Sequence, residues 1–147
     1  MRVLALDYGS ARCGCAISDP TGTIVTPIEM VPRPLSRRGM AALKALVAAR
    51  EVERVVVGLP LSLRGGETMQ TRETREFVLR LARALNDPAG GEGGRFIPVE
   101  MHDERFTTRM AQRMEGASTE EDSRAAAHML EGWLAAWHRE RRSSSSR

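Results

Sequence analysis

Near its amino terminus the chain reads Arg2-Val3-Leu4-Ala5-Leu6-Asp7-Tyr8-Gly9, a short apolar run that ends in a carboxylate and a glycine. A strand buried on both faces is a near-continuous apolar run, so charge is expected only where the strand emerges. Open α/β sheets bind their ligands at the carboxyl ends of strands. Asp7 is therefore the first candidate for chemistry, and the nearby Gly9 and Gly14 would let a phosphate or a metal approach the backbone.

The remaining patterns predict an α/β domain, a mixed five-stranded sheet with helices on both faces. Short apolar runs between turn residues are typical of strands, and apolar stripes at helical spacing are typical of helices. Strands are expected over residues 2–7, 13–18, 23–30 and 55–58, with a fifth after Pro98 that ends near His102. Helices are expected from a cap at Ser36 to about Arg50, and over residues 67–85, 107–115 and 119–140. The domain would cover residues 1–140, and the basic, serine-rich residues 141–147 would form a disordered tail.

Composition and charge narrow the class of protein. A chain of 147 residues with 41% hydrophobic and 28% charged residues is typical of one soluble globular domain. The formal net charge is +3, and every lysine or arginine position except Lys44 holds an arginine. Arginine suits bidentate phosphate contacts, although genomic base composition would explain the same preference. The sequence shows no signal peptide and no apolar run of membrane-spanning length, so we expect a cytoplasmic protein with no membrane partner.

The two cysteines, Cys13 and Cys15, are separated by one residue and would share one face of a strand. Two thiols alone are too few ligands for a zinc site. Their spacing therefore predicts two small, reduced core residues.

Carboxylates stand where two predicted strands end. Asp7 closes the first strand, and Asp103 and Glu104 follow the fifth, where the spacing does not choose between them. If the first and fifth strands are parallel neighbours, Asp7 and the second acid emerge at one edge of the sheet.

Asp122, at the start of the long predicted helix, is the third candidate. It lies one turn before an apolar stripe, and a carboxylate on the face that packs against a sheet needs a cation or a metal as its partner. The stripe consists of Ala126, Met129, Leu130, Trp133 and Trp137. Two alternatives stay open, because Asp122 also fits a helix-capping pattern after Thr119 and could pair with an arginine.

Three acids at one sheet edge would make a hard-oxygen site suited to Mg²⁺ or Mn²⁺. Two such ions about 4 Å apart can activate a water and stabilise the leaving oxygen in phosphodiester cleavage. No protein nucleophile is then required. His102, at a strand end, would be a base, a support for the ligands, or a surface residue.

Four segments resemble, in order and spacing, the motifs of the YqgF/RuvX family. They are Leu6-Asp7-Tyr8-Gly9-Ser10-Ala11-Arg12-Cys13-Gly14-Cys15-Ala16-Ile17-Ser18-Asp19, Val57-Gly58-Leu59-Pro60-Leu61 with Gly65, Asp103-Glu104-Arg105-Phe106-Thr107-Thr108, and Asp122-Ser123-Arg124-Ala125-Ala126. The resemblance spans residues 3 to about 137 and implies a ribonuclease H-like fold. Members of that family are described as Holliday junction resolvases and as nucleases that mature the 5′ end of 16S ribosomal RNA.

The resemblance also implies roles for individual residues, and it favours Glu104 over Asp103. The catalytic acids that bind divalent metal would be Asp7, Glu104 and Asp122. The cations that face the phosphates of nucleic acid would be Arg12, Arg105 and Arg109. The floor of the cleft would be formed by Gly58-Leu59-Pro60.

Three departures from the family pattern bear on the substrate. Ser62 and Arg64 stand in the loop after Pro60, where the pattern has an asparagine and an aspartate. The segment between Thr108 and Asp122 is short, and Thr119-Glu120-Glu121 replaces the usual basic residues before the last acid. The replacement before the last acid weakens the expectations for substrate binding more than those for the metal site, and it leaves room for an altered substrate.

Together these features predict a metal-dependent nuclease for structured nucleic acid, acting in 5′-end maturation of the 16S ribosomal RNA precursor. Branched DNA, the substrate of a Holliday junction resolvase, is the alternative. A non-catalytic nucleic-acid-binding module of the same fold is a further alternative, since fold does not fix function. An actin-like ATPase would need two lobes with such loops, and this chain has one Asp-x-Gly. We expect nucleic acid as the partner and a monomer or homodimer.

Overall fold

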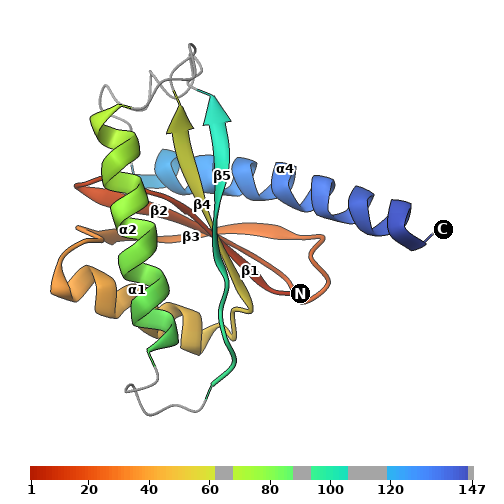
Figure 1. The fold of residues 1–147 in the computed structure, drawn as a ribbon, viewed down its shortest axis with the longest axis horizontal. Helices are drawn as coiled ribbons and strands as arrows, with labels where there is room; N and C mark the ends of the chain where they lie inside the picture. The colour runs from red at the N-terminus through yellow and green to blue at the C-terminus, as the bar shows by residue number, and fades with distance from the viewer. Residues whose placement is uncertain (62–67, 88–93, 106–118, 146–147) are drawn as a thin grey trace.

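The structure is a computed structural model that describes residues 1–61, 68–87, 94–105 and 119–145. For residues 61, 104–105 and 119–122 it describes the backbone alone. Five strands and three helices make up the described part of the chain (Figure 1). In chain order they are β1 (Val3–Asp7), β2 (Arg12–Ser18), β3 (Val25–Pro32), α1 (Arg37–Ala49), β4 (Arg54–Leu61), α2 (Met69–Asn86), β5 (Val99–Arg105) and α4 (Thr119–Ser145).

The strands form one mixed sheet in the order β3-β2-β1-β4-β5. β2 pairs antiparallel with both β1 and β3, while β4 pairs parallel with both β1 and β5. This confirms the predicted mixed five-stranded sheet. The first and fifth strands are not neighbours, however, because β4 lies between them. Since both run parallel to β4, their carboxyl ends still reach the same edge of the sheet.

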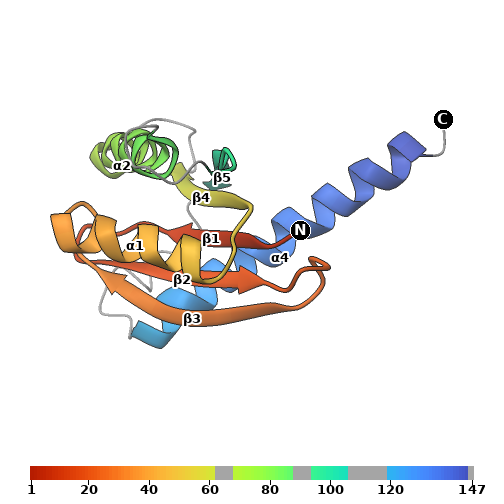
Figure 2. The same cartoon turned by 90° about the horizontal axis from the view of Figure 1, so that it is seen from below.

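Side-chain alternation divides the sheet into two apolar faces. On β1, Leu4 and Leu6 pack with buried residues of α1 and α2, and we call this side the α1–α2 face. Val3 and Ala5 pack with buried residues of α4, on the side that we call the α4 face. Figure 2 shows the sheet between these helices, so the prediction of helices on both faces is confirmed.

Local signals set where α1 and α2 begin. Ser36 caps α1 as predicted, and its Oγ accepts a hydrogen bond from the Gly39 backbone N–H at 3.0 Å. A Cβ at Gly39 would lie 2.0 Å from a backbone carbonyl oxygen of the preceding loop, so only glycine fits there. Thr68 forms a capping box with Thr71, whose hydroxyl also donates to the Pro60 carbonyl at 2.7 Å. That bond ties the start of α2 to the carboxyl end of β4.

The last helix, α4, is longer than the sequence predicts. Residues 141–145 are helical rather than part of a disordered tail, because α4 continues through Ser145. Two contacts support this extension: the Arg141 guanidinium lies 5.3 Å from the centroid of the Trp137 ring, and Trp137 stacks on Trp133. Arginine and glutamate are also good helix formers, which the serine-rich composition of the tail obscures. The short helix expected over residues 107–115 lies outside the described residues.

Cys13 and Cys15 are both buried in the apolar cluster of the α1–α2 face, and they form no disulfide with each other. The prediction of two core residues on one face of a strand is therefore confirmed. Within the described ranges, no helix has the length and hydropathy that a membrane span requires.

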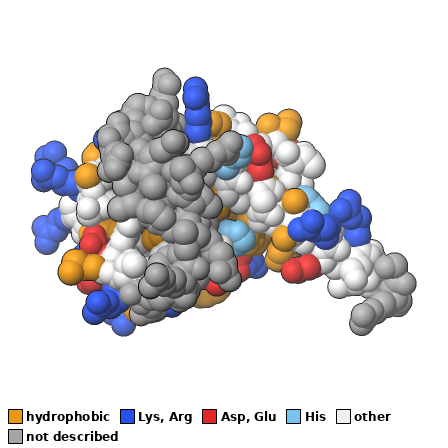
Figure 3. All heavy atoms as spheres, turned by 90° about the horizontal axis from the view of Figure 1, so that it is seen from above, with side chains coloured by type: hydrophobic (Ala, Val, Ile, Leu, Met, Phe, Trp, Pro, Cys, Tyr) orange, Lys and Arg blue, Asp and Glu red, His pale blue; other side chains and the backbone are white. Residues whose placement is uncertain are grey.

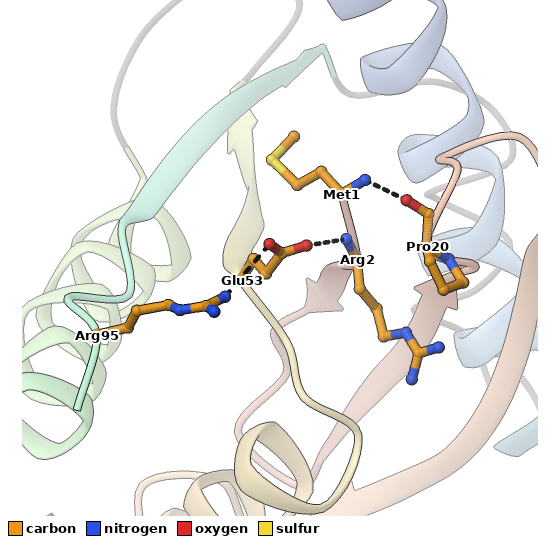
Figure 4. Close-up of polar contacts among 5 residues, drawn as sticks. All are labelled: Met1, Arg2, Pro20, Glu53 and Arg95. Carbon is orange, nitrogen blue, oxygen red and sulfur yellow. Dashed lines mark hydrogen bonds and ion pairs between the residues drawn. The ribbon is translucent and has the colours of Figure 1, made fainter.

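A polar cluster holds the amino end of β1 to neighbouring segments (Figure 4). The Glu53 carboxylate accepts a hydrogen bond from the Arg2 backbone N–H at 2.8 Å and forms an ion pair with Arg95 at 3.4 Å. The amino group of Met1 donates to the Pro20 carbonyl. This cluster fixes the end of β1 that is opposite to Asp7.

Candidate active site

Asp7 is the last residue of β1 and lies on the α4 face. Val3 and Ala5 pack under α4, and strand alternation gives Asp7 the same side. Its side chain is partly exposed, whereas the four residues before it are buried. A carboxylate therefore does stand where β1 leaves the core, as the apolar run predicts.

Tyr8 packs on the opposite face and was not singled out from the sequence. It is 4% exposed, its ring stacks on that of Phe77 with 4.7 Å between centroids, and its hydroxyl donates to the Glu73 carboxylate. Burial, together with the hydrogen bond and the negative charge of Glu73, raises the pKa of Tyr8 well above its usual range. The hydroxyl is thus a permanent donor at neutral pH, and it anchors the residue after Asp7 to α2.

The turn between β1 and β2 requires a glycine at position 9. A Cβ there would lie 2.7 Å from the Arg12 carbonyl oxygen, closer than real Cβ contacts allow. The turn itself is therefore enough to explain Gly9, in addition to any clearance for a phosphate. Arg12 begins β2 and alternates with Ala16, which packs under α4, so Arg12 and Asp7 share a face near the same end of the sheet.

The parallel register separates Asp103 from Glu104, which the sequence spacing alone cannot do. Asp103 pairs with Leu59, a position that continues the α1–α2 set of β4. The exposed Asp103 side chain therefore lies on the side of the sheet away from Asp7. Glu104 occupies the alternate set of backbone positions along β5, and its side chain is outside the described part of the structure.

The backbone of Glu104 stands two strands from Asp7. The ladder between β1 and β4 ends at Leu6 and Val57, so Asp7 is level with the next residue of β4, which pairs with His102. His102 is half-buried and lies on the same alternation set as position 104. Standard strand dimensions put position 104 roughly 10 Å across the sheet from Asp7 and roughly 7 Å further along it.

Ser123 fixes the first turn of α4 beside β1. Its side chain is 4% exposed, and its hydroxyl donates to the Ile28 carbonyl at 2.8 Å and accepts from the Cys15 backbone N–H at 3.4 Å. Cys15 pairs across the sheet with the β1 residue just before Asp7. The backbone of Asp122, one residue before Ser123, therefore lies at the same end of the α4 face as Asp7.

Three of the predicted site residues thus have their backbone positions toward one end of the α4 face, and for two of them the structure describes the backbone alone. Asp7 has a described side chain, whereas Glu104 and Asp122 are placed by strand register and by the Ser123 contacts. Arg105 is placed as the last backbone position of β5, and Arg109 lies outside the described residues. Among the described side chains there is no cluster of three potential metal ligands. The chemistry of the three acids, all hard oxygen donors, nevertheless fits Mg²⁺ or Mn²⁺.

The mixed five-stranded sheet with helices on both faces is a ribonuclease H-like fold. The structure superimposes on Thermus thermophilus RuvC in complex with a Holliday junction substrate with a TM-score of 0.56. The match covers 94% of this chain and 96% of that one at 15% sequence identity, which shows a shared fold.

Sequence comparison identifies the family within that class. Residues 1–136 match the model of the RuvX family, described as Holliday junction resolvase. A protein of Chloroflexus aggregans named "Putative pre-16S rRNA nuclease" is 42% identical over 76% of this chain and 72% of its own length. A protein of Anaeromyxobacter with the same name is 36% identical over 94% of this chain and 99% of its own length. The chain belongs to the RuvX family, which places it among the nucleases.

Proposed function

We propose that this protein is a cytoplasmic, divalent-metal-dependent nuclease that trims the 5′ end of the 16S ribosomal RNA precursor. The observation that carries the proposal is the convergence of Asp7 and the Ser123-anchored first turn of α4 at one end of the α4 face. The names of the relatives supply the substrate, since both proteins described above are named for pre-16S rRNA.

In this proposal Asp7, Glu104 and Asp122 hold Mg²⁺ or Mn²⁺. When bound there, the metal would supply activation of a water and charge stabilisation for the leaving oxygen of the scissile phosphodiester. The protein's own part is to place three carboxylates from three elements, β1, β5 and α4, at one sheet edge. A buried polar contact as well as apolar packing joins α4 to the sheet, and this contact lies next to Asp122 in the chain.

Arginines would bind the nucleic acid beside the acids. Arg12 shares the face of Asp7 near the turn between β1 and β2, where its guanidinium can hold a phosphate by two parallel hydrogen bonds. Arg105, the last residue of β5, and Arg109, four residues later in the chain, complete the proposed set. Phosphate contacts of this kind predict that binding weakens steeply with salt.

The first prediction is that cleavage requires all three acids and the metal. Purified protein is incubated with 5′-extended 16S precursor RNA and with a four-way DNA junction, in Mg²⁺ or Mn²⁺ and with the metal chelated. Asp7→Asn, Glu104→Gln and Asp122→Asn should each lower the cleavage rate by at least about 100-fold, since each removes a charged ligand. Chelation should abolish cleavage.

Asp103→Asn is the matched control, because it neutralises the neighbour of Glu104 on the opposite face of the sheet. It should cleave like the parent. Cleavage by Asp7→Asn or Asp122→Asn at the parental rate would overturn the three-acid site. Loss of activity in Asp103→Asn alone would indicate that the active site lies on the other face of the sheet.

Branched DNA is the second candidate substrate. Two findings favour it: the family is described as Holliday junction resolvase, and the fold is that of a RuvC bound to a Holliday junction. Faster cleavage of the four-way junction than of the precursor RNA would select this function. Binding of either nucleic acid without cleavage in any metal would instead indicate a non-catalytic module.

A further inference from the structure

We propose that Ser123 is a positioning residue that sets the metal affinity of the site by fixing the backbone of Asp122. The inference rests on the proposed function, in which Asp122 is a metal ligand. It concerns a hydroxyl group that touches neither substrate nor metal and that joins three elements of the fold.

The first observation is that the Ser123 hydroxyl both donates and accepts a hydrogen bond. Its hydroxyl donates to the Ile28 carbonyl of β3 at 2.8 Å and accepts from the Cys15 N–H of β2 at 3.4 Å. The side chain is 4% exposed, so water cannot readily replace either bond. A single hydroxyl therefore binds α4 to both strands of the β2–β3 pair.

The second observation is where this contact falls in the sheet. Cys15 and Ile28 are register partners, and the ladder between β2 and β3 is irregular here because the next pair is Cys13 with Val31. One residue separates the two pairs on β2 and two separate them on β3, which is the pattern of a β-bulge. Bulges interrupt ladder pairing, and Ser123 inserts its hydroxyl at this interruption.

The third observation is the relation of this point to the acids. Cys15 pairs with Leu6, and the next pair of the same ladder is Gly14 with Asp7. The anchor thus lies one residue from the level of Asp7, and Asp122 directly precedes it in the chain. Since helix ends fray more readily than helix interiors, a buried contact in the first turn of α4 holds that turn against the sheet. The next buried residue of α4 is Ala126, almost a turn later.

The chain offers a matched control in Ser18, at the other end of the same strand pair. Ser18 is 2% exposed, and its hydroxyl accepts from the Val3 N–H at 2.8 Å and donates to the Met1 carbonyl at 3.3 Å. It is thus a second buried serine that bridges two backbone groups, far from Asp122. Replacing either serine by alanine orphans one donor and one acceptor, so the two variants should lose similar stability.

The experiment compares Ser123→Ala with Ser18→Ala, below the melting temperature of both. Calorimetry measures Mn²⁺ binding, and mass spectrometry measures hydrogen exchange of the α4 amides. The kcat and KM are measured with whichever of the precursor RNA and the four-way junction the parent cleaves. Ser123→Ala should weaken Mn²⁺ binding by about 10- to 100-fold, as outer-shell substitutions do, and lower kcat more than it raises KM. Exchange should accelerate in the first turn of α4. Ser18→Ala should leave Mn²⁺ affinity and kcat at parental values.

The outcomes distinguish failure of the positioning role of Ser123 from failure of the proposed metal site. Parental Mn²⁺ affinity in Ser123→Ala, or equal weakening in Ser18→Ala, overturns the positioning role while leaving the nuclease proposal in place if Asp122→Asn is inactive. Parental Mn²⁺ binding and cleavage by Asp122→Asn instead overturns the proposed metal site. If Ser123→Ala does not fold, Ser123→Cys and Ser18→Cys keep the shape with a weaker hydrogen-bonding group and give the same comparison.

Discussion

Two adjacent residues at the end of β1 serve opposite faces of the sheet. Asp7 lies on the α4 face with the candidate site, while Tyr8 is buried on the α1–α2 face against Phe77 and Glu73. Asp7 could be predicted, because a charge that closes an apolar run marks the strand exit. The role of Tyr8 could not, because its partner Glu73 is 65 residues away in the chain. No local pattern encodes such a contact.

The choice between Asp103 and Glu104 shows the same limit. Adjacent residues of a strand face opposite sides, so a shift of one residue exchanges their roles. The register of β5 and its neighbouring strand cannot be read from the sequence alone. The pairing of Asp103 with Leu59 in the structure establishes both. The resemblance to the family favours Glu104, whose backbone position in the register belongs to the same side of the sheet as Asp7.

At alkaline pH the stability of the protein should depend on Tyr8. The raised native pKa means that the unfolded chain, with an ordinary tyrosine pKa of about 10, loses its proton first. The contribution of Tyr8 is therefore complete below about pH 10 and declines as the pH rises toward the native pKa. Tyr8→Phe should lack this decline, so urea unfolding of parent and variant should converge in free energy above about pH 10.

Direct titration checks the same prediction, because Tyr8 is the sole tyrosine of the chain. Tyrosinate absorbance should stay low in the native protein at a pH where the urea-unfolded protein has ionised. Glu73→Gln, which removes the negative charge but keeps an acceptor, should lower the native pKa of Tyr8. Native and unfolded titrations that coincide would contradict the proposed hydrogen bond.

Among the elements, the bounds of α1 and α2 agree with the sequence-based expectation, whereas α4 ends later than expected. Ser36 predicts the start of α1, because a serine that precedes an amphipathic run can supply the capping oxygen from within the same segment. The sequence predicts an earlier end for α4, because the serine-rich composition of residues 141–147 gives no sign of the contact between Arg141 and Trp137. A ring four residues earlier in the same helix can hold an arginine that composition alone assigns to solvent.

The β2–β3 hairpin depends on the turn formed around Asp19. The Asp19 carboxylate accepts hydrogen bonds from the Thr23 N–H at 2.8 Å, the Ile24 N–H at 2.9 Å and the Thr21 hydroxyl. The bond from Thr21, followed by the backbone bond from Ile24, lowers the pKa of Asp19 well below its usual range. Gly22, with φ of 72°, completes a turn that other residues would strain.

Acid should weaken this hairpin. The lowered native pKa means that the Asp19 contribution is fully present above the unfolded pKa of about 4 and is lost as the pH falls through the native pKa. Asp19→Ala should melt at a lower temperature than the parent at neutral pH, and this difference should shrink in strong acid. Thr21→Val, which keeps the carboxylate, should show a smaller difference. A gap that stays constant with pH would show that the charge of Asp19 is not involved.

At the scale of the whole molecule, α4 organises one face of the sheet. It packs across β1, β2 and β3, and its far end projects beyond the sheet, where arginine side chains gather in the view of Figure 3. The apolar spacing of α4 predicts that this helix is buried on one side. The strand order that it covers could not be predicted, because strand pairing depends on contacts between distant segments.

Loss of packing under α4 should destabilise the whole domain. Leu130 is fully buried in the cluster of the α4 face, so Leu130→Ala should lower the free energy of unfolding by about 2–5 kcal/mol in urea titrations. Glu131→Ala, at the exposed neighbouring position, should change it by no more than about 0.5 kcal/mol. A small effect at Leu130 would indicate that α4 can detach while the sheet stays folded.

The stacked Trp133 and Trp137 are the only tryptophans of the chain, and both belong to α4, whereas the single tyrosine lies on the other face. Each side of the sheet therefore carries its own chromophore. Tryptophan fluorescence reports the separation of α4 from the sheet. Tyrosine absorbance reports unfolding on the α1–α2 face. Two unfolding curves recorded on one unlabelled sample will superimpose only if both layers separate from the sheet together.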